Sequence, residues 1–194
     1  MNKGRLEAFS DGVLAIVITI MVLEMRPPHE GAWASLSPLL PVFLSYVLSF
    51  LHLGIYWNNH HHLFQVCRHV DGRVLWANLH LLFWLSLVPF VTAWMGESRF
   101  DARPVALYGG VLLMAACAYY LLTRALLSVH GADSALARAL GNDVKGKASV
   151  AVYVLAIAVS FLVPLVACAL YLAVAIAWLI PDPRMEKVLA EQQA

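Results

Sequence analysis

Long apolar runs recur along almost the whole chain, and they limit the possible fold more than any other feature of the sequence. They extend from residue 12 to residue 180, and only short polar stretches interrupt them. Of the 194 residues, 61% are hydrophobic and 13% are charged, whereas soluble domains hold about 45–50% apolar and about 25% charged residues. The composition therefore predicts an all-α integral membrane protein that forms a single domain over residues 1–194.

Membrane spans can be assigned by length, because a spanning helix needs about 20 apolar residues to cross a hydrocarbon core of about 30 Å. The last run has no charged residue from Ala148 to Ile180 and is too long for one span. Pro164 near its middle would break or kink a helix. We divide it into two short helices, while one kinked and steeply tilted helix is the alternative. The predicted spans are approximately residues 6–25, 38–64, 74–95, 104–127, 148–162 and 164–180.

The distribution of basic residues favours six spans with both termini in the cytoplasm, because Lys and Arg concentrate on that side of a membrane. With six spans, ten of the thirteen Lys and Arg residues lie inside, including Arg184 and Lys187. With five spans these two residues move outside and the division weakens to eight against five. We therefore expect a multi-pass protein of the cell inner (plasma) membrane, with residues 128–147 as a cytoplasmic loop.

Several classes of function are disfavoured by residues that the chain lacks. The net charge is +1 and no basic run occurs, which argues against nucleic acid as a partner. The three cysteines show no CxxC spacing that would suggest zinc or redox chemistry. No GxSxG or HExxH motif occurs either. The sequence predicts a protein that is not an enzyme and that has no metal site and no cofactor.

The first predicted span carries a carboxylate, although a charge at membrane depth costs about 2.5–3.5 kcal/mol on insertion scales. At about 100° per residue, Asp11 lies about 140° from Ile16 around the helix. The stripe that contains Ile16 also holds Ile20 and Leu23, with Thr19 beside it and Gly12 extending it. Asp11 is therefore expected to face neighbouring helices. The Ile and Leu stripe is expected to face a different environment. On an arbitrary membrane helix that environment would be lipid or the core of the protein.

The beginning of this span, Arg5-x-x-x-Phe9-Ser10-Asp11, resembles the signature of the endosomal and lysosomal transmembrane potassium channel family in its single-repeat bacterial form. The six-span layout and the aromatic, His-rich end of the second span are similar too, so the resemblance covers essentially the full chain. It implies a homotetramer in membrane lipid, with four copies of the first helix around a central pore. The TVGYG carbonyl filter of ordinary potassium channels does not occur in the sequence.

Carried onto this chain, the resemblance places the narrowest ring of the pore at Ile16, followed by Ile20 and Leu23, with Thr19 as a polar neighbour. Such apolar rings form a hydrophobic constriction that can gate by dewetting. A tight apolar passage favours potassium modestly, because potassium is more weakly hydrated than sodium. The expected function is passive conduction of potassium and other monovalent cations.

The second predicted span carries a continuous polar stripe, formed by Ser45, Ser49, His52, Tyr56 and Asn59. A polar stripe cannot face lipid without cost, so we expect it to form hydrogen bonds with other helices. The span ends in Trp57 and three consecutive histidines, residues 60–62. Consecutive residues point in different directions on a helix, whereas metal ligands on one face need a spacing of three or four. A zinc site made by these histidines is therefore disfavoured.

The family resemblance implies a network of polar contacts that holds the pore helix in register. The network would join Ser10 and Asp11 to His60 or His61, to Asn78 and to Arg5. Phe9, Gly12 and Trp57 complete the residues assigned to the motif and its interhelical contacts. Which histidine points inward is left open by the sequence.

The later spans are expected to form a structural scaffold. Pro89 and Thr92 predict a kink toward the outer end of the third span, and Gly109-Gly110 permits close packing of the fourth. An alternative function is a proton- or cation-coupled secondary transporter that uses intramembrane Asp11 and the histidines His52 and His80. The chain shows no internal repeat of the kind that many transporters have, which favours the channel.

Overall fold

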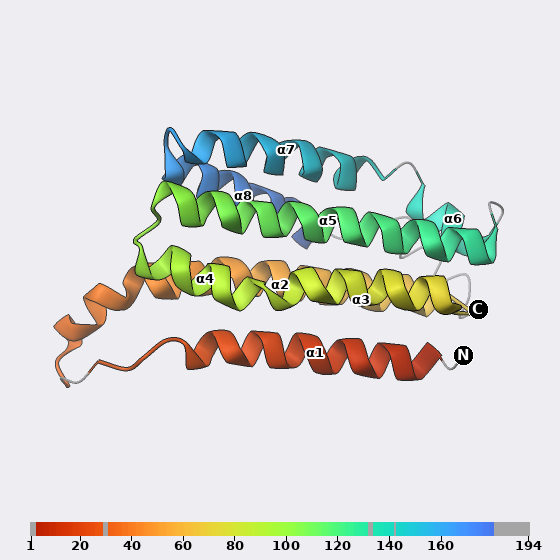
Figure 1. Ribbon diagram of the computed structural model, residues 1–194, viewed down its shortest axis with the longest axis horizontal. Coiled ribbons are helices and arrows are strands. Elements are labelled where there is room, and N and C mark those ends of the chain that lie inside the picture. The colour runs from red at the N-terminus through yellow and green to blue at the C-terminus, as the bar shows by residue number, and fades with distance from the viewer. Residues whose placement is uncertain (1–2, 29–30, 132–133, 142, 181–194) are drawn as a thin grey trace.

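The computed structural model describes residues 3–28, 31–131, 134–141 and 143–180, and these residues form a bundle of helices (Figure 1). The helices are α1 (Lys3–Leu23), α2 (Leu40–Val66), α3 (Gly72–Ser86), α4 (Val88–Glu97), α5 (Ala102–His130), α6 (Ala135–Leu140), α7 (Val144–Ser160) and α8 (Pro164–Leu179). A short 3₁₀ helix, η1 (Trp33–Leu39), precedes α2.

Four helical segments are long and apolar enough to cross a membrane, namely Lys3–Leu23, Trp33–Val66, Gly72–Glu97 and Ala102–His130. Helix α8 is apolar but shorter. The prediction of an all-α membrane protein is therefore confirmed for the described part of the chain. Arg184 and Lys187, on which part of the charge argument depends, lie outside the described residues.

The third predicted span is broken at Leu87 into α3 and α4. Pro89 lies in the first turn of α4, and because it has no N–H it cannot donate a helical hydrogen bond to Leu85. The backbone N–H of Leu87 instead donates to the carbonyl oxygen of Trp84 at 3.2 Å, which closes a tighter turn. The break thus lies just before the proline that predicts it.

The last apolar run folds into two helices, α7 and α8. Pro164 is the first residue of α8, a position where the missing N–H of proline would have no helical partner in any case. In the turn before it, the N–H of Val163 donates to the carbonyl oxygen of Val159 at 2.8 Å. The chain reverses there, and α7 and α8 pack side by side (Figure 1). One kinked helix over residues 148–180 is not what this segment forms.

Helices α5 and α7 are both longer than the apolar pattern indicates, so the polar segment between them is shorter than predicted. Helix α5 continues to His130 and α7 begins at Val144. The side chain of Asp143 accepts a hydrogen bond from the N–H of Gly146 at 3.1 Å and so caps α7 before its apolar part begins.

The bundle has α1 at one edge, α2, α3 and α4 beside it, and α5, α7 and α8 on the far side (Figure 1). Helix α1 contacts α2, α3 and α4. It packs through one buried stripe, formed by Leu6, Ser10, Leu14, Val17 and Met21. These residues recur every three or four positions, so they share one side of the helix. The opposite side of α1 is exposed, and at its border Ile16 and Ile20 line a groove with Pro89 and Phe90 of α4.

The two adjacent glycines of α5 differ in their surroundings, and this difference gives a prediction. A Cβ on Gly109 would overlap the hydroxyl of Tyr171 and lie 2.9 Å from Cγ1 of Ile157, whereas a Cβ on Gly110 would meet nothing within 4 Å. Overpacking a filled site costs about 1–3 kcal/mol. Gly109→Ala should lower the free energy of unfolding by that amount. Gly110→Ala is the matched control and should leave it unchanged or raise it by up to about 1 kcal/mol.

Thermal unfolding of the two variants in detergent, followed by circular dichroism, measures the difference. Equal melting temperatures for the two variants would show that α5 does not pack against α8 through Gly109.

Candidate functional site

The side of α1 that faces away from the bundle is apolar and open. Ile16 is 58% exposed, Ile20 39% and Leu23 79%. Thr19 is exposed between them, and its hydroxyl donates to the carbonyl oxygen of Ile16 at 2.9 Å. Gly12 is exposed one turn before Ile16. The structure therefore brings together on one open face the residues that the resemblance assigns to the pore.

Three of the expected network residues form a buried chain of hydrogen bonds between α1, α2 and α3. The Nδ2 of Asn78 donates to Oγ of Ser10 at 2.9 Å, and Nε2 of His60 donates to Oδ1 of Asn78 at 2.8 Å. Ser10 also donates to the carbonyl oxygen of Leu6 at 2.9 Å. All three side chains are at most 2% exposed. Of the two candidate histidines, His60 is the one that points inward.

Asp11 lies outside this buried chain, unlike the arrangement expected for it. Neighbouring residues are about 100° apart around a helix, so Ser10 and Asp11 point toward different partners. The indole Nε1 of Trp57 donates to Oδ1 of Asp11 at 3.0 Å. The ring of His61 stacks on that indole, with centroids 5.8 Å apart and an angle of 16° between the planes. Asp11 and His61 thus belong to a second, exposed group centred on Trp57.

Two of the remaining motif residues stand at the surface. Arg5 is exposed on α1, and Phe9 is 56% exposed. The structure does not join Arg5 to the buried chain of Ser10, Asn78 and His60. Arg5 lies five positions before Ser10, and this spacing turns the two side chains toward different sides of the helix.

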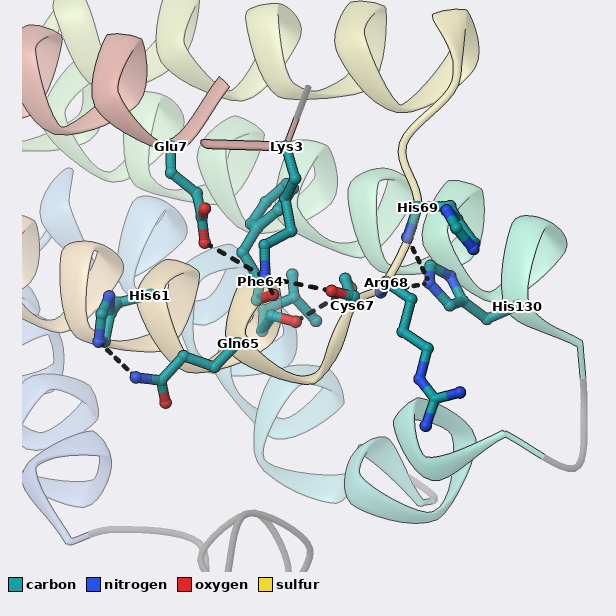
Figure 2. Close-up of polar contacts among 10 residues, drawn as sticks. Lys3, Glu7, His61, Phe64, Gln65, Cys67, Arg68, His69 and His130 are labelled. Carbon is teal, nitrogen blue, oxygen red and sulfur yellow. Dashed lines mark hydrogen bonds and ion pairs between the residues drawn. The ribbon is translucent and has the colours of Figure 1, made fainter. Parts of the chain in front are cut away.

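The start of α1 is attached to the end of α2 by a contact that the sequence analysis missed (Figure 2). The ammonium of Lys3 donates to the carbonyl oxygens of Phe64 at 2.8 Å and Cys67 at 3.1 Å. A cation at the last carbonyls of a helix satisfies groups that have no helical partner. A lysine before the motif is the signal that could have suggested this contact.

The loop that follows α2 is fastened to the end of α5 by His130 (Figure 2). Its Nε2 accepts hydrogen bonds from the N–H groups of Arg68 at 2.9 Å and His69 at 3.3 Å. Its Nδ1 bonds to the carbonyl oxygen of Leu126 at 2.9 Å. Together, Lys3 and His130 fix the end of α2 that carries His60 and His61.

The polar stripe of α2 faces the interior, away from the open side of α1. The hydroxyls of Ser49 and Thr92 are 2.6 Å apart, and Ser49 donates to the hydroxyl of Tyr108 at 3.2 Å. His52 is buried beside Tyr108. In the described chain this stripe joins α2 to α4 and α5 as an ordinary interhelical network.

The groups that motivated a coupled transporter are not assembled into one site. Asp11 bonds to Trp57, whereas Nδ1 of His52 bonds to the carbonyl oxygen of Leu48. His80 accepts a hydrogen bond from the indole of Trp84, on its own helix, at 3.0 Å. Within the described residues, no group of three His, Cys, Asp or Glu side chains could hold a metal ion.

The fold and the open apolar side of α1 define a class of protein, namely an integral membrane protein built from long apolar helices. Comparison with known proteins identifies the family. Residues 5–89 match the model of the endosomal/lysosomal potassium channel TMEM175. A potassium channel of Chryseobacterium sp. (strain P1-3) is 56% identical over 191 residues, which are 98% of this chain and 100% of that protein. The chain belongs to the TMEM175 family.

Two further relatives agree with this membership. The crystal structure of a lysosomal potassium-selective channel TMEM175 homolog from Chamaesiphon minutus superposes with a TM-score of 0.78 and 29% identity, over 91% of this chain and 96% of that one. The human endosomal/lysosomal proton channel TMEM175 is 40% identical over 116 residues, which cover 54% of this chain and 23% of the human protein.

Proposed function

We propose that the protein is a potassium-permeable cation channel whose pore is lined by the open face of α1. The relative that is 56% identical over its whole length carries the name potassium channel, and the crystal structure that resembles this chain is described as potassium-selective. The observation that supports the pore assignment is the exposure of Ile16, Ile20 and Leu23 on a face of α1 beside its packed stripe, where Ile16 and Ile20 also line a groove against α4.

Lipid could also cover an exposed apolar face, but Asp11 and Thr19 of α1 favour contact with a second copy of the chain and with water. Asp11 is exposed eight residues after Lys3, which is about 12 Å along the helix. A carboxylate at such a depth is costly against lipid. A second copy of the chain beside Asp11 and Trp57, and water against Thr19, would remove that cost. The same contacts would place the face of Ile16 at the axis of an oligomer.

The assembly that fits this arrangement is a homotetramer, in which each subunit spans the membrane six times and has both termini in the cytoplasm. Four copies of Ile16 then form the narrowest ring of the pore, and the pore is wider at the rings formed by Ile20 and Leu23. An apolar ring with no carbonyl filter controls conduction through wetting and through the cost of removing water from the ion. We place the assembly in the plasma membrane of a bacterium.

Purified protein in liposomes should conduct potassium down its gradient without any coupled substrate. The current should vary with the driving force and favour potassium over sodium, because potassium is the more weakly hydrated ion. Planar-bilayer recording under opposed potassium and sodium gradients measures both properties. Electroneutral flux, or flux that requires a proton gradient, would instead support a coupled transporter.

The number of subunits is tested separately from conduction. Native mass spectrometry of the detergent-purified protein should give four times the chain mass of 21.4 kDa. A dimer or a monomer that still conducts would contradict the pore geometry proposed for α1.

A further inference from the structure

A cavity of about 550 Å³ lies between α2, α5, α7 and α8. Helices α5, α7 and α8 are on the side of the bundle away from α1 (Figure 1). The volume is within the range of about 300–1,000 Å³ that is usual for small-molecule sites. No lining residue belongs to the open face of α1 or to the buried chain of Ser10, Asn78 and His60. The cavity is therefore separate from the site already described.

The cavity reaches the outer surface of the bundle at α5. Tyr120 and Leu121 line it and are 48% and 50% exposed. Helix α5 is long and apolar enough to cross a membrane. Side chains exposed on this side of the bundle meet lipid, because α1 and the proposed pore lie on the other side. A molecule dissolved in the bilayer therefore has a lateral route into the cavity.

The wall of the cavity changes from charged to apolar along α7. Asp143 and Lys147 line it at the start of the helix, and Val150 and Tyr153 line it further along. From Lys147 to Tyr153 the helix rises about 9 Å, whereas one leaflet of the hydrocarbon core is about 15 Å thick. The cavity is thus polar at one end and apolar at the other, as a lipid is, and its apolar part is long enough for about half of an acyl chain.

Two lysines make the charged end of the cavity positive. Lys147 is exposed, and its ammonium forms no hydrogen bond or ion pair with the residues that the structure describes. The ammonium of Lys145 lies 5.9 Å from the ring centroid of Trp178, which also lines the cavity. The carboxylate of Asp143 accepts a hydrogen bond from the N–H of Gly146 at 3.1 Å, and the positive end of the helix dipole offsets part of its charge. The unpaired ammonium of Lys147 favours a ligand with an anionic group.

We propose that this cavity binds one anionic phospholipid, with an acyl chain between α5 and α7 and the phosphate beside Lys147. Basic pockets between transmembrane helices attract anionic headgroups, and an acyl chain gives the apolar wall the contacts that a void lacks. The indole of Trp178 donates to the hydroxyl of Ser149 at 2.8 Å, so it lies between the charged and the apolar parts, as tryptophans at a membrane interface do. The site does not depend on the conduction proposed above.

Native mass spectrometry of the detergent-purified, full-length protein measures the binding of each lipid. One phosphatidylglycerol should bind per chain, about tenfold more tightly than phosphatidylcholine with the same acyl chains, because each basic residue near the membrane surface attracts an anionic headgroup. Glycerol 1-phosphate carries a phosphate but no acyl chain, and a large excess of it should not displace the lipid. Equal binding of the two lipids would overturn the role of charge. Displacement by glycerol 1-phosphate would overturn the role of the acyl chain.

Two pairs of variants locate the phosphate and the acyl chain. Lys147→Gln should reduce the preference for phosphatidylglycerol to about threefold or less. Arg73→Gln, at an exposed residue of α3 outside the cavity, is its control and should keep the preference. Ala116→Phe fills the cavity and should abolish the binding of both lipids. Ala151→Phe adds the same ring on the exposed side of α7, outside the cavity, and should leave binding unchanged.

The same preference in Lys147→Gln as in Arg73→Gln would overturn the position of the phosphate. Lipid binding that survives in a folded Ala116→Phe variant would overturn the cavity as the site. Lipid bound to dissociated monomers and never to the oligomer would show that a second copy of the chain covers the cavity, which would also overturn the proposal.

A second measurement covers the case in which Ala116→Phe does not fold. One equivalent of phosphatidylglycerol with brominated acyl chains should quench the fluorescence of Trp178, because that indole lines the cavity. The quenched part of the signal should be absent in Trp178→Phe. Quenching that is the same in Trp178→Phe as in the unmodified protein would place the acyl chain elsewhere.

Discussion

Replacing Ile16 by Asn should raise the single-channel conductance about tenfold and reduce the preference for potassium over sodium. Ile16 is 58% exposed on α1, about 120° around the helix from the centre of the stripe that packs against the bundle. Four amides at this level would keep water in the constriction and partly replace the hydration shell of the ion. A tenfold rise corresponds to a barrier lower by about 1.4 kcal/mol. Planar-bilayer recordings of both proteins provide the test.

Ile176→Asn is the matched control. Ile176 lies on α8 and is 52% exposed, close to the 58% of Ile16. Helix α8 lies on the side of the bundle away from α1 and the proposed pore (Figure 1). It should change neither conductance nor selectivity. If Ile16→Asn assembles normally and its permeation is unchanged, Ile16 is not the constriction.

Asn78→Leu should destabilise the protein strongly and abolish most of the current. Asn78 links Ser10 of α1 to His60 of α2 through both ends of its amide. Leucine would leave two buried polar groups without that partner, at about 1–3 kcal/mol each. Ser10 keeps its bond to Leu6, so we expect a total loss of about 2–4 kcal/mol. The melting temperature should fall by roughly 4–16 °C, measured in detergent.

Asn58→Leu is the control for this substitution, since Asn58 is exposed on α2. It makes the same chemical change without cutting the buried chain, so its melting temperature should remain near that of the unmodified protein. A melting temperature of Asn78→Leu that matches this control would show that the amide is not what fixes α1 against α2 and α3.

The positions of the helix breaks could be predicted from the sequence, because proline has a local effect. Pro164 and Pro89 each stop the hydrogen-bond pattern of the helix before them, whatever packs nearby. The buried stripe of α1 and the interior stripe of α2 were accessible too, since a period of 3.6 residues assigns side chains to faces. These features depend on residues that are close in sequence.

The partners of individual polar residues could not be predicted in the same way. Three consecutive histidines leave the register of α2 open, and only the packed structure selects His60 for Asn78 and His61 for Trp57. Ser10 and Asp11 are adjacent in sequence and still bond to different helices. Such choices depend on the rotation of each helix in the bundle, which distant contacts determine.

The cavity between α2, α5, α7 and α8 left no trace in the sequence for a related reason. Its wall combines residues from four helices, such as His52 and Tyr153, and no local spacing relates them. The cavity arises because neighbouring helices fail to fill the space completely, and this is a property of the packed bundle.

The attachment of α1 has a mechanical consequence. Among the described residues, the side-chain hydrogen bonds that join α1 to other helices all lie between Lys3 and Asp11. Beyond Asp11, α1 is held by apolar side chains such as Val17 and Met21, whose contacts are non-directional. The half of α1 that carries Ile16, Ile20 and Leu23 can therefore tilt relative to the fixed segment between Lys3 and Asp11. Such a movement breaks no side-chain hydrogen bond between helices of the described chain.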